Sequence, residues 1–222
     1  MTPTRRRFPL LATLAAALLL PLLLAGCVNP FEPAQPELPS GEGVPENYGS
    51  IEELLFTIEQ AIATRPGGAN AYIHAFADST TPSQRGFRAF HDQAVKAAWL
   101  IGSAGQPAPE PWTLPFERGL YSELSRIRPN DEYLFAFSPD PLSVRDEEIA
   151  DNVFSIHRKY QLFALPGNNV DPVLIVSGYA DLLIQKEGAR YSIFEWRDRV
   201  DPDYGVNSVD VRSFTYERLE SQ

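Results

Sequence analysis

Residues 152–200 read NVFSIHRKYQLFALPGNNVDPVLIVSGYADLLIQKEGARYSIFEWRDRV, and this stretch decides the fold. Apolar and polar side chains alternate in it with a period of two, which is typical of β-strands with one buried face. A turn containing glycine separates each strand from the next. Because short turns join antiparallel neighbours, the pattern predicts an antiparallel sheet with strands over residues 152–165, 173–185 and 190–198.

The pattern extends to both sides of this stretch. A shorter alternating run predicts a strand over residues 133–138. After the turn Asp201-Pro202-Asp203, residues 206–219 are predicted to form a final strand.

Upstream of residue 130 the period of the apolar residues is close to that of a helix. Ser50 and Glu53 form a capping box, the S-x-x-E pattern that starts helices. One apolar stripe then follows at helical spacing: Ile51, Leu54, Leu55, Ile58 and Ile62. Further helices are predicted over residues 69–77 and 116–127, whereas residues 86–103 fit either a helix or a short strand.

Helices followed by a run of strands indicate the α+β class. An antiparallel sheet commonly buries one face, so the leading helices are expected to cover that face of a curved sheet. The sequence divides into three parts: a leader (1–26), a tether (27–49) and one folded domain (50–222).

Composition excludes several classes of function. The 222 residues include 19 basic and 29 acidic side chains, which gives a net charge of −10, and only one cysteine. A lone cysteine cannot form an internal disulfide or a multi-thiolate metal site. An acidic chain lacks the basic surface that binds nucleic acid. No phosphate loop, dinucleotide fingerprint or HExxH motif is present, and we expect no metal and no cofactor.

The N-terminus has the pattern of an export signal. Arg5-Arg6-Arg7 precede an uncharged run over residues 8–24 and then small residues. The ending Leu24-Ala25-Gly26-Cys27 resembles the lipobox of bacterial lipoproteins. This resemblance implies cleavage between Gly26 and Cys27 and acylation of Cys27, which would attach the chain to a membrane through lipid. The alternatives are a membrane-spanning anchor and an ordinary cleaved secretory signal.

The residues around this signal bear on the export route and the destination. Thr4 to Phe8 resemble the twin-arginine export motif, and both that route and the general secretory route stay open. Val28 stands where an Asp signals inner-membrane retention in enteric bacteria, so the outer membrane facing the periplasm is the expected location. Residues 28–49 are rich in Pro and Glu, and contain no Lys or Arg, which predicts an extended acidic tether without regular structure.

The order of elements resembles the nuclear-transport-factor-like, cystatin-like α+β cone superfamily, and more narrowly bacterial lipoproteins of uncharacterised function with such a domain. The similar stretches are SIEELLFTIEQAIATR, NAYIHAFAD, KYQLFAL and YSIFEWRDRVDPDYG. The resemblance implies a cone whose helices and bent sheet enclose a pocket. Some members are isomerases or dehydratases with an Asp, His or Tyr in that pocket.

Two residues are candidates for acid–base chemistry in such a pocket, Asp181 and His74. Arg158 falls in phase with the apolar residues of its strand, and a charge on an apolar face must be paired or line a cavity. Asp181 is in phase with Ile175 and Tyr179, so a pair between Arg158 and Asp181 across neighbouring strands stays open, as does a bulge that would turn either residue to solvent. The pocket candidates are Arg158, Asp181, Tyr160, Tyr179 and Trp196.

Two further polar residues have expected positions. His157 is expected to face solvent. Asp198 is expected to accept backbone hydrogen bonds in the turn before Pro202.

The sequence as a whole predicts a lipid-anchored cell-envelope protein with a non-catalytic domain that binds a small apolar ligand or an envelope protein. The alternative is a pocket enzyme of the isomerase or dehydratase type that uses an Asp or a His. Formation of a homodimer through the open face of the sheet stays open.

Overall fold

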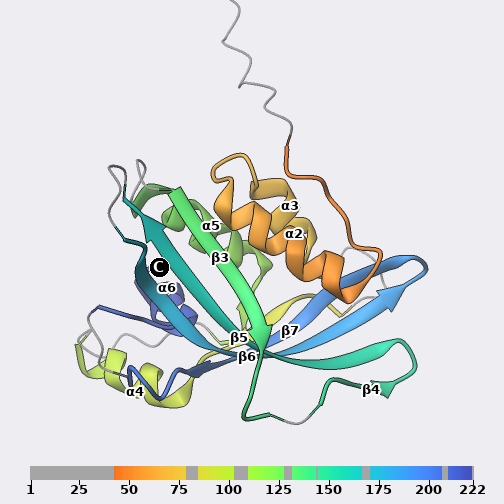
Figure 1. Ribbon diagram of the computed structural model, residues 1–222. Coiled ribbons are helices and arrows are strands. Elements are labelled where there is room, and N and C mark those ends of the chain that lie inside the picture. The colour runs from red at the N-terminus through yellow and green to blue at the C-terminus, as the bar shows by residue number, and fades with distance from the viewer. Residues whose placement is uncertain are drawn as a thin grey trace, which may run out of the picture. The chain divides into compact units, whose positions relative to one another are not determined.

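The structure is a computed structural model, and Figure 1 shows its elements. It describes residues 43–78, 85–102, 110–127, 132–143, 145–166, 171–206 and 210–221. The predicted leader, Cys27 and most of the predicted tether lie outside the described residues.

A seven-stranded, curved, mixed sheet forms the centre of the described domain, in the order β2-β1-β7-β6-β5-β3, with β4 also paired to β5. The strands are β1 (Arg88–Phe90), β2 (Trp112–Thr113), β3 (Glu132–Pro139), β4 (Glu147–Ala150), β5 (Val153–Leu165), β6 (Val173–Glu187) and β7 (Arg190–Val200). All neighbours are antiparallel except β1 and β7. The predicted α+β class with a curved sheet is confirmed, and the parallel β1 makes the sheet mixed rather than purely antiparallel.

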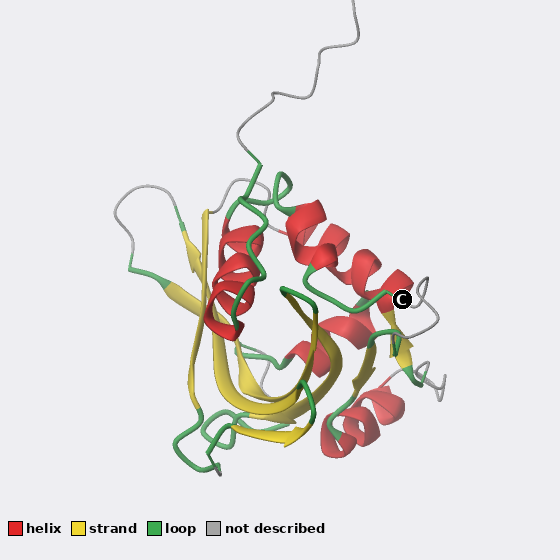
Figure 2. Ribbon diagram, turned by 90° about the vertical axis from the view of Figure 1, so that its right-hand side faces the viewer, coloured by secondary structure: helices red, strands yellow, loops and turns green. Residues whose placement is uncertain are grey.

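Five helices are described: α2 (Ile51–Ala63), α3 (Ala69–His74), α4 (Gln93–Gly102), α5 (Leu114–Ile127) and α6 (Phe214–Glu220). Helix α2 begins where the capping box predicts, because the Ser50 side chain accepts a hydrogen bond from the Glu53 amide at 3.1 Å. Its apolar stripe buries Leu54, Ile58 and Ile62. Figure 2 shows this helix on the concave side of the curved sheet.

One sequence prediction of secondary structure needs correction. The predicted final strand over residues 206–219 is wrong in its second half, where helix α6 forms instead. Ser213 caps that helix by accepting a hydrogen bond from the Tyr216 amide. The alternating Val209 and Val211 just before it favoured the strand prediction. The ambiguous stretch 86–103 contains both expected forms, strand β1 and then helix α4, and strands β2 and β4 were not predicted.

Part of the segment predicted as tether lies against the domain. Val44 and Tyr48 are buried among core residues. The Tyr48 hydroxyl donates to the carbonyl of Ala71 at 2.8 Å, and its own carbonyl accepts from the Tyr191 amide at 2.8 Å. The packed part of the chain therefore includes residues before the first helix.

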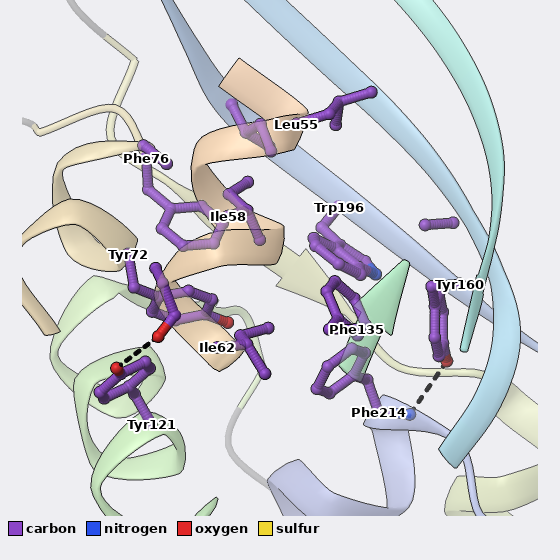
Figure 3. Packing of buried hydrophobic residues seen from close by; sticks show 14 of the residues in the cluster. Leu55, Ile58, Ile62, Tyr72, Phe76, Tyr121, Phe135, Tyr160, Trp196 and Phe214 are labelled. Carbon is purple, nitrogen blue, oxygen red and sulfur yellow. Dashed lines mark hydrogen bonds between the residues drawn. The ribbon is translucent and has the colours of Figure 1, made fainter. Parts of the chain in front are cut away.

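Aromatic rings fill the space between the sheet and helix α6 (Figure 3). The ring of Phe214 lies 4.9 Å from Tyr160, 5.6 Å from Trp196 and 5.6 Å from Phe135, centroid to centroid. Gly178 lies opposite Tyr160 in the ladder, and a Cβ at Gly178 would overlap the tyrosine hydroxyl. Strand β6 thus needs glycine at this point so that Tyr160 can pack inward.

A buried ion pair links helices α5 and α6. The guanidinium of Arg218 donates to both carboxylate oxygens of Glu117, at 2.9 and 3.0 Å, and neither side chain is exposed to solvent. The Tyr72 hydroxyl and the Trp112 indole N–H also donate to Glu117, at 2.7 and 2.8 Å. Burial opposes the charge of Arg218, but Glu117 outweighs this effect and raises the pKa of Arg218 above its ordinary value.

This arrangement makes a test of stability. Arg218→Met should lower the free energy of unfolding by about 3–5 kcal/mol, because it leaves the Glu117 carboxylate buried without its cation. The double variant Arg218→Met/Glu117→Gln should recover most of this loss, since the amide is neutral. The control Arg126→Met removes an exposed pair with Glu123 and should cost less than about 0.5 kcal/mol. Urea denaturation measures all three, and an Arg218→Met loss as small as that of the control would contradict the assignment.

Candidate functional site

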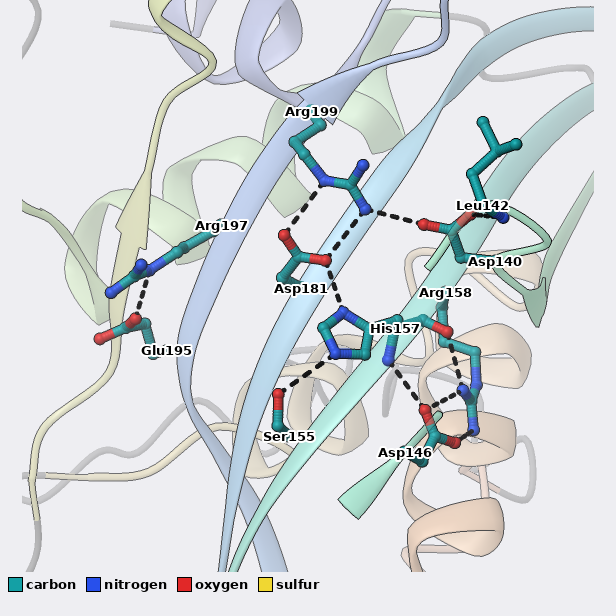
Figure 4. Close-up of polar contacts among 10 residues, drawn as sticks. All are labelled: Asp140, Leu142, Asp146, Ser155, His157, Arg158, Asp181, Glu195, Arg197 and Arg199. Atoms are coloured by element: carbon teal, nitrogen blue, oxygen red, sulfur yellow. Dashed lines mark hydrogen bonds and ion pairs between the residues drawn. The ribbon is translucent and has the colours of Figure 1, made fainter. Parts of the chain in front are cut away.

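The convex face of the sheet carries a network of charged side chains (Figure 4). On β5 and β6 the buried residues Ile156, Tyr160 and Leu182 point to the core, so His157, Lys159 and Asp181, each one position away from a core residue, point to the opposite face. Arg158 has the same phase as Ile156 and Tyr160, and its guanidinium reaches Asp146. The register places His157 directly across from Asp181. We call the side chains gathered on and beside this face the outer-face network: Asp140, Asp146, His157, Arg158, Lys159, Asp181, Glu195, Arg197, Arg199 and Asp201.

Asp181 lies at the centre of this network. It accepts hydrogen bonds from Arg199 at 3.0 and 3.1 Å and lies 2.7 Å from Nδ1 of His157. Arg199 also donates to Asp140 at 2.8 Å, so one guanidinium joins two carboxylates. Burial alone would lower the pKa of Arg199, but its bonds to Asp140 and Asp181 raise it above the ordinary value.

The pair that the sequence left open between Arg158 and Asp181 does not form. Arg158 lies across from Ala180 in the ladder, and its guanidinium pairs with Asp146 at 2.7 Å. The error came from the phase of strand β6: its core face consists of Val176, Ala180, Leu182 and Ile184, so Asp181 points to the other side. Burial would raise the pKa of Asp146, but the hydrogen bonds from Arg158 and from the His157 amide hold it below its usual value.

His157 lies on the face away from the core, as the phase of its strand predicted, but its side chain is only 16% exposed, which is less than the predicted solvent exposure. The Ser155 hydroxyl lies 3.4 Å from Nε2 of His157, so Ser155, His157 and Asp181 follow the order of a nucleophile relay. Such a relay needs backbone donors for the oxyanion. Strand β5 is paired on both sides at Ser155, with Glu147 of β4 and Leu183 of β6. The backbone amides at this point are therefore engaged in the sheet and are not positioned as donors to an oxyanion beside Ser155.

Further along the same face, Lys159 pairs with Asp201 at 2.8 Å, and the Ser177 hydroxyl donates to Asp201 at 2.6 Å. Burial would raise the pKa of Asp201, but these two bonds hold it below its usual range. Tyr179 lies between two cations, with Lys159 at 5.4 Å and Arg199 at 5.5 Å from its ring centroid. The face is therefore a connected set of ion pairs.

The remaining two pocket candidates, Tyr160 and Trp196, lie in the core on the opposite side of the sheet. The structure thus does not bring the five candidates together in one pocket. The Tyr160 hydroxyl donates to Asp198 at 2.6 Å and accepts from the Phe214 amide at 2.9 Å, which ties it to the start of α6.

Asp198 has a different place from the one that the sequence suggested. It is buried, and it accepts from the Thr215 amide at 2.6 Å in addition to Tyr160. Burial raises the pKa of Asp198 above its ordinary value. The predicted turn role belongs to Asp201, which accepts from the Asp203 amide at 3.1 Å.

His74, the second acid–base candidate, lies at the end of α3, where its Nδ1 is 2.8 Å from Glu46. It is more than half exposed and belongs to a different part of the domain from Asp181, which is on the convex face. No group of three or more metal-binding side chains occurs among the described residues. The outer-face network, in which Asp181 contacts both His157 and Arg199, is the candidate functional site.

Sequence comparisons find no relative. No family model matches this chain. No curated protein matches it either.

Several solved structures are similar to this chain in fold. A scytalone dehydratase-like protein from Novosphingobium aromaticivorans has a TM-score of 0.47 at 7% identity, over 72% of this chain and 89% of its own. An NTF-2-like protein of unknown function from Shewanella oneidensis has a TM-score of 0.40 at 13% identity, over 67% and 94%. A protein of unknown function with a cystatin-like fold from Nostoc punctiforme has a TM-score of 0.41 at 12% identity, over 68% and 89%. The last two bear the fold names that the sequence resemblance implied, and at these values the similarity says nothing about activity or ligand.

Proposed function

We propose that this chain is a lipid-anchored cell-envelope protein whose α+β domain is a non-catalytic binding module, and that its outer-face network binds a second copy of the chain. The lipid anchor rests on the sequence, from the basic start through the apolar run to Cys27. No helix among the described residues is long and apolar enough to span a membrane. The observation that carries the binding role is the charged convex face of strands β5 to β7.

The charges on this face favour contact between identical copies. The chain as a whole is strongly acidic, so two copies repel each other over most of their surface. Within the outer-face network, cations and carboxylates are nearly balanced and are paired with one another. A locally neutral face is where self-association meets the least repulsion.

The distribution of charge across the face also suits a two-fold contact. Arg197, on β7, is 63% exposed even though it pairs with Glu195. Glu147, on β4, lies across from Ser155 in the ladder, so its side chain is on the same face, and it is exposed. Because β7 and β4 lie on opposite sides of β5 and β6, a two-fold axis over those central strands would bring Arg197 of one copy toward Glu147 of the other.

A charge swap tests this contact. Light scattering of the detergent-solubilised full chain should give the mass of a dimer. Arg197→Glu should weaken dimerisation about tenfold or more, because it places like charges together. The double variant Arg197→Glu/Glu147→Arg should restore the dimer. The control Arg126→Glu, on helix α5, should leave it unchanged. A wild-type monomer, or a double variant no better than the single one, would refute the contact.

The lipid anchor has a separate test. Wild-type chain expressed in bacteria should incorporate labelled palmitate and stay with the membrane after a carbonate wash, since several acyl chains anchor a protein stably. Cys27→Ser should incorporate no label, because the chain has no other thiol. Val28→Ala is the matched control and should be labelled normally. Label on Cys27→Ser, or a mature protein that does not begin at Cys27, would exclude this anchor.

A further inference from the structure

The Lys and Arg side chains of the outer-face network are paired with carboxylates of the same network. Most other Lys and Arg side chains of the described domain also have a partner within the chain. Nearly every described Lys and Arg has an acidic, carbonyl or aromatic partner: Arg65, Arg85, Lys96, Arg126, Arg158, Lys159, Lys186, Arg190, Arg197, Arg199, Arg212 and Arg218. Among the described residues only Arg88, Arg118 and Arg145 have none. In a chain with a ten-residue excess of acids, unpaired arginines are unexpected.

Two of these three arginines line the same hollow. It has a volume of about 460 Å³ and lies where β1, the residues after α3 and the start of α5 meet. Arg88 comes from β1 and Arg118 from the second turn of α5. Much of the remaining wall is apolar and includes Phe87, Leu114 and Pro115. The volume is in the range that accommodates small organic ligands.

Arg118 also lines a second hollow of about 290 Å³ between α3 and α5, beside Ile73, His74 and Tyr121. The guanidinium therefore belongs to the walls of two adjoining depressions, each with apolar side chains. His74, which the sequence suggested as a candidate, lines the smaller one and is paired with Glu46. The acidic group in the larger hollow is Asp78, which already has an interaction partner.

We infer that Arg88 and Arg118 form a binding site for an organic carboxylate with an apolar body. Guanidinium groups bind carboxylates through paired, charge-assisted hydrogen bonds. The apolar wall would cover the carbon skeleton of the ligand, and Asp78 in the same hollow disfavours ligands with two negative charges. This site is separate from the outer-face network, and it does not depend on dimerisation or on the lipid anchor.

Calorimetric titration of the purified full chain with 4-phenylbutyrate tests the site. The isosteric neutral amide, 4-phenylbutanamide, has the same apolar body and lacks the charge. The carboxylate should bind, and the amide should bind at least tenfold more weakly, because a hydrogen bond to a charged group contributes more than a neutral one. Equal binding of the two compounds, or no binding of the carboxylate, would overturn the inference.

Variants locate the site. Arg118→Gln and Arg88→Gln should each weaken 4-phenylbutyrate binding about tenfold, and the double variant should abolish it. Arg145→Gln is the matched control, because Arg145 is also exposed and unpaired but lines neither hollow. Thermal unfolding checks that each variant is folded. We expect all of them to fold, because the three arginine side chains are exposed. An equal loss in Arg145→Gln, or wild-type binding in Arg118→Gln, would show that the arginines do not form the site.

Discussion

The buried pair between Glu117 and Arg218 is the interaction on which the rest of the domain depends. Glu117, on helix α5, accepts hydrogen bonds from three other elements: Arg218 of α6, Trp112 of β2 and Tyr72 of α3. Two charges removed from water are costly unless their partners are complete. The pair thus requires all of these elements to be in place, and it also fixes α6 against the sheet, where Phe214 and Asp198 complete the core.

The position of α6 explains why the interior of the domain contains aromatic rings and buried polar groups where the resemblance led us to expect a pocket. Phe214 packs on Tyr160 and Trp196, and the first amides of the helix donate to the Tyr160 hydroxyl and to Asp198. The Tyr160 hydroxyl and the Asp198 carboxylate are therefore hydrogen-bonded within the chain itself. The chemistry that faces outward is consequently on the convex side of the sheet and around α5.

The sequence predicted the parts of the fold that local pattern determines. The capping box at Ser50, the stripe of α2 and the long strands β5, β6 and β7 each follow from spacing within a few residues. The prediction failed where register or tertiary contact decides. Apolar residues of β6 fall in both phases of its alternation, and the core-facing phase is the one with Leu182, so alternation alone put Asp181 on the wrong face and suggested a pair with Arg158. Helix α6 was missed because a contact that holds it in place, Arg218 with Glu117, joins residues 101 positions apart in the sequence.

Net charge and local charge lead to different conclusions for this chain. The overall excess of acids argues against anionic partners at long range, and the expectation of no nucleic-acid partner rests on that argument. Beyond roughly 8 Å at physiological ionic strength, however, charges are largely screened, so a ligand in a hollow responds to the groups that line it. Paired cations on the convex face produce a nearly neutral surface, whereas the unpaired Arg88 and Arg118 produce a local excess of positive charge. An acidic chain can therefore present one surface suited to its own copy and a separate one suited to a carboxylate, because each depends on which side chains are already paired.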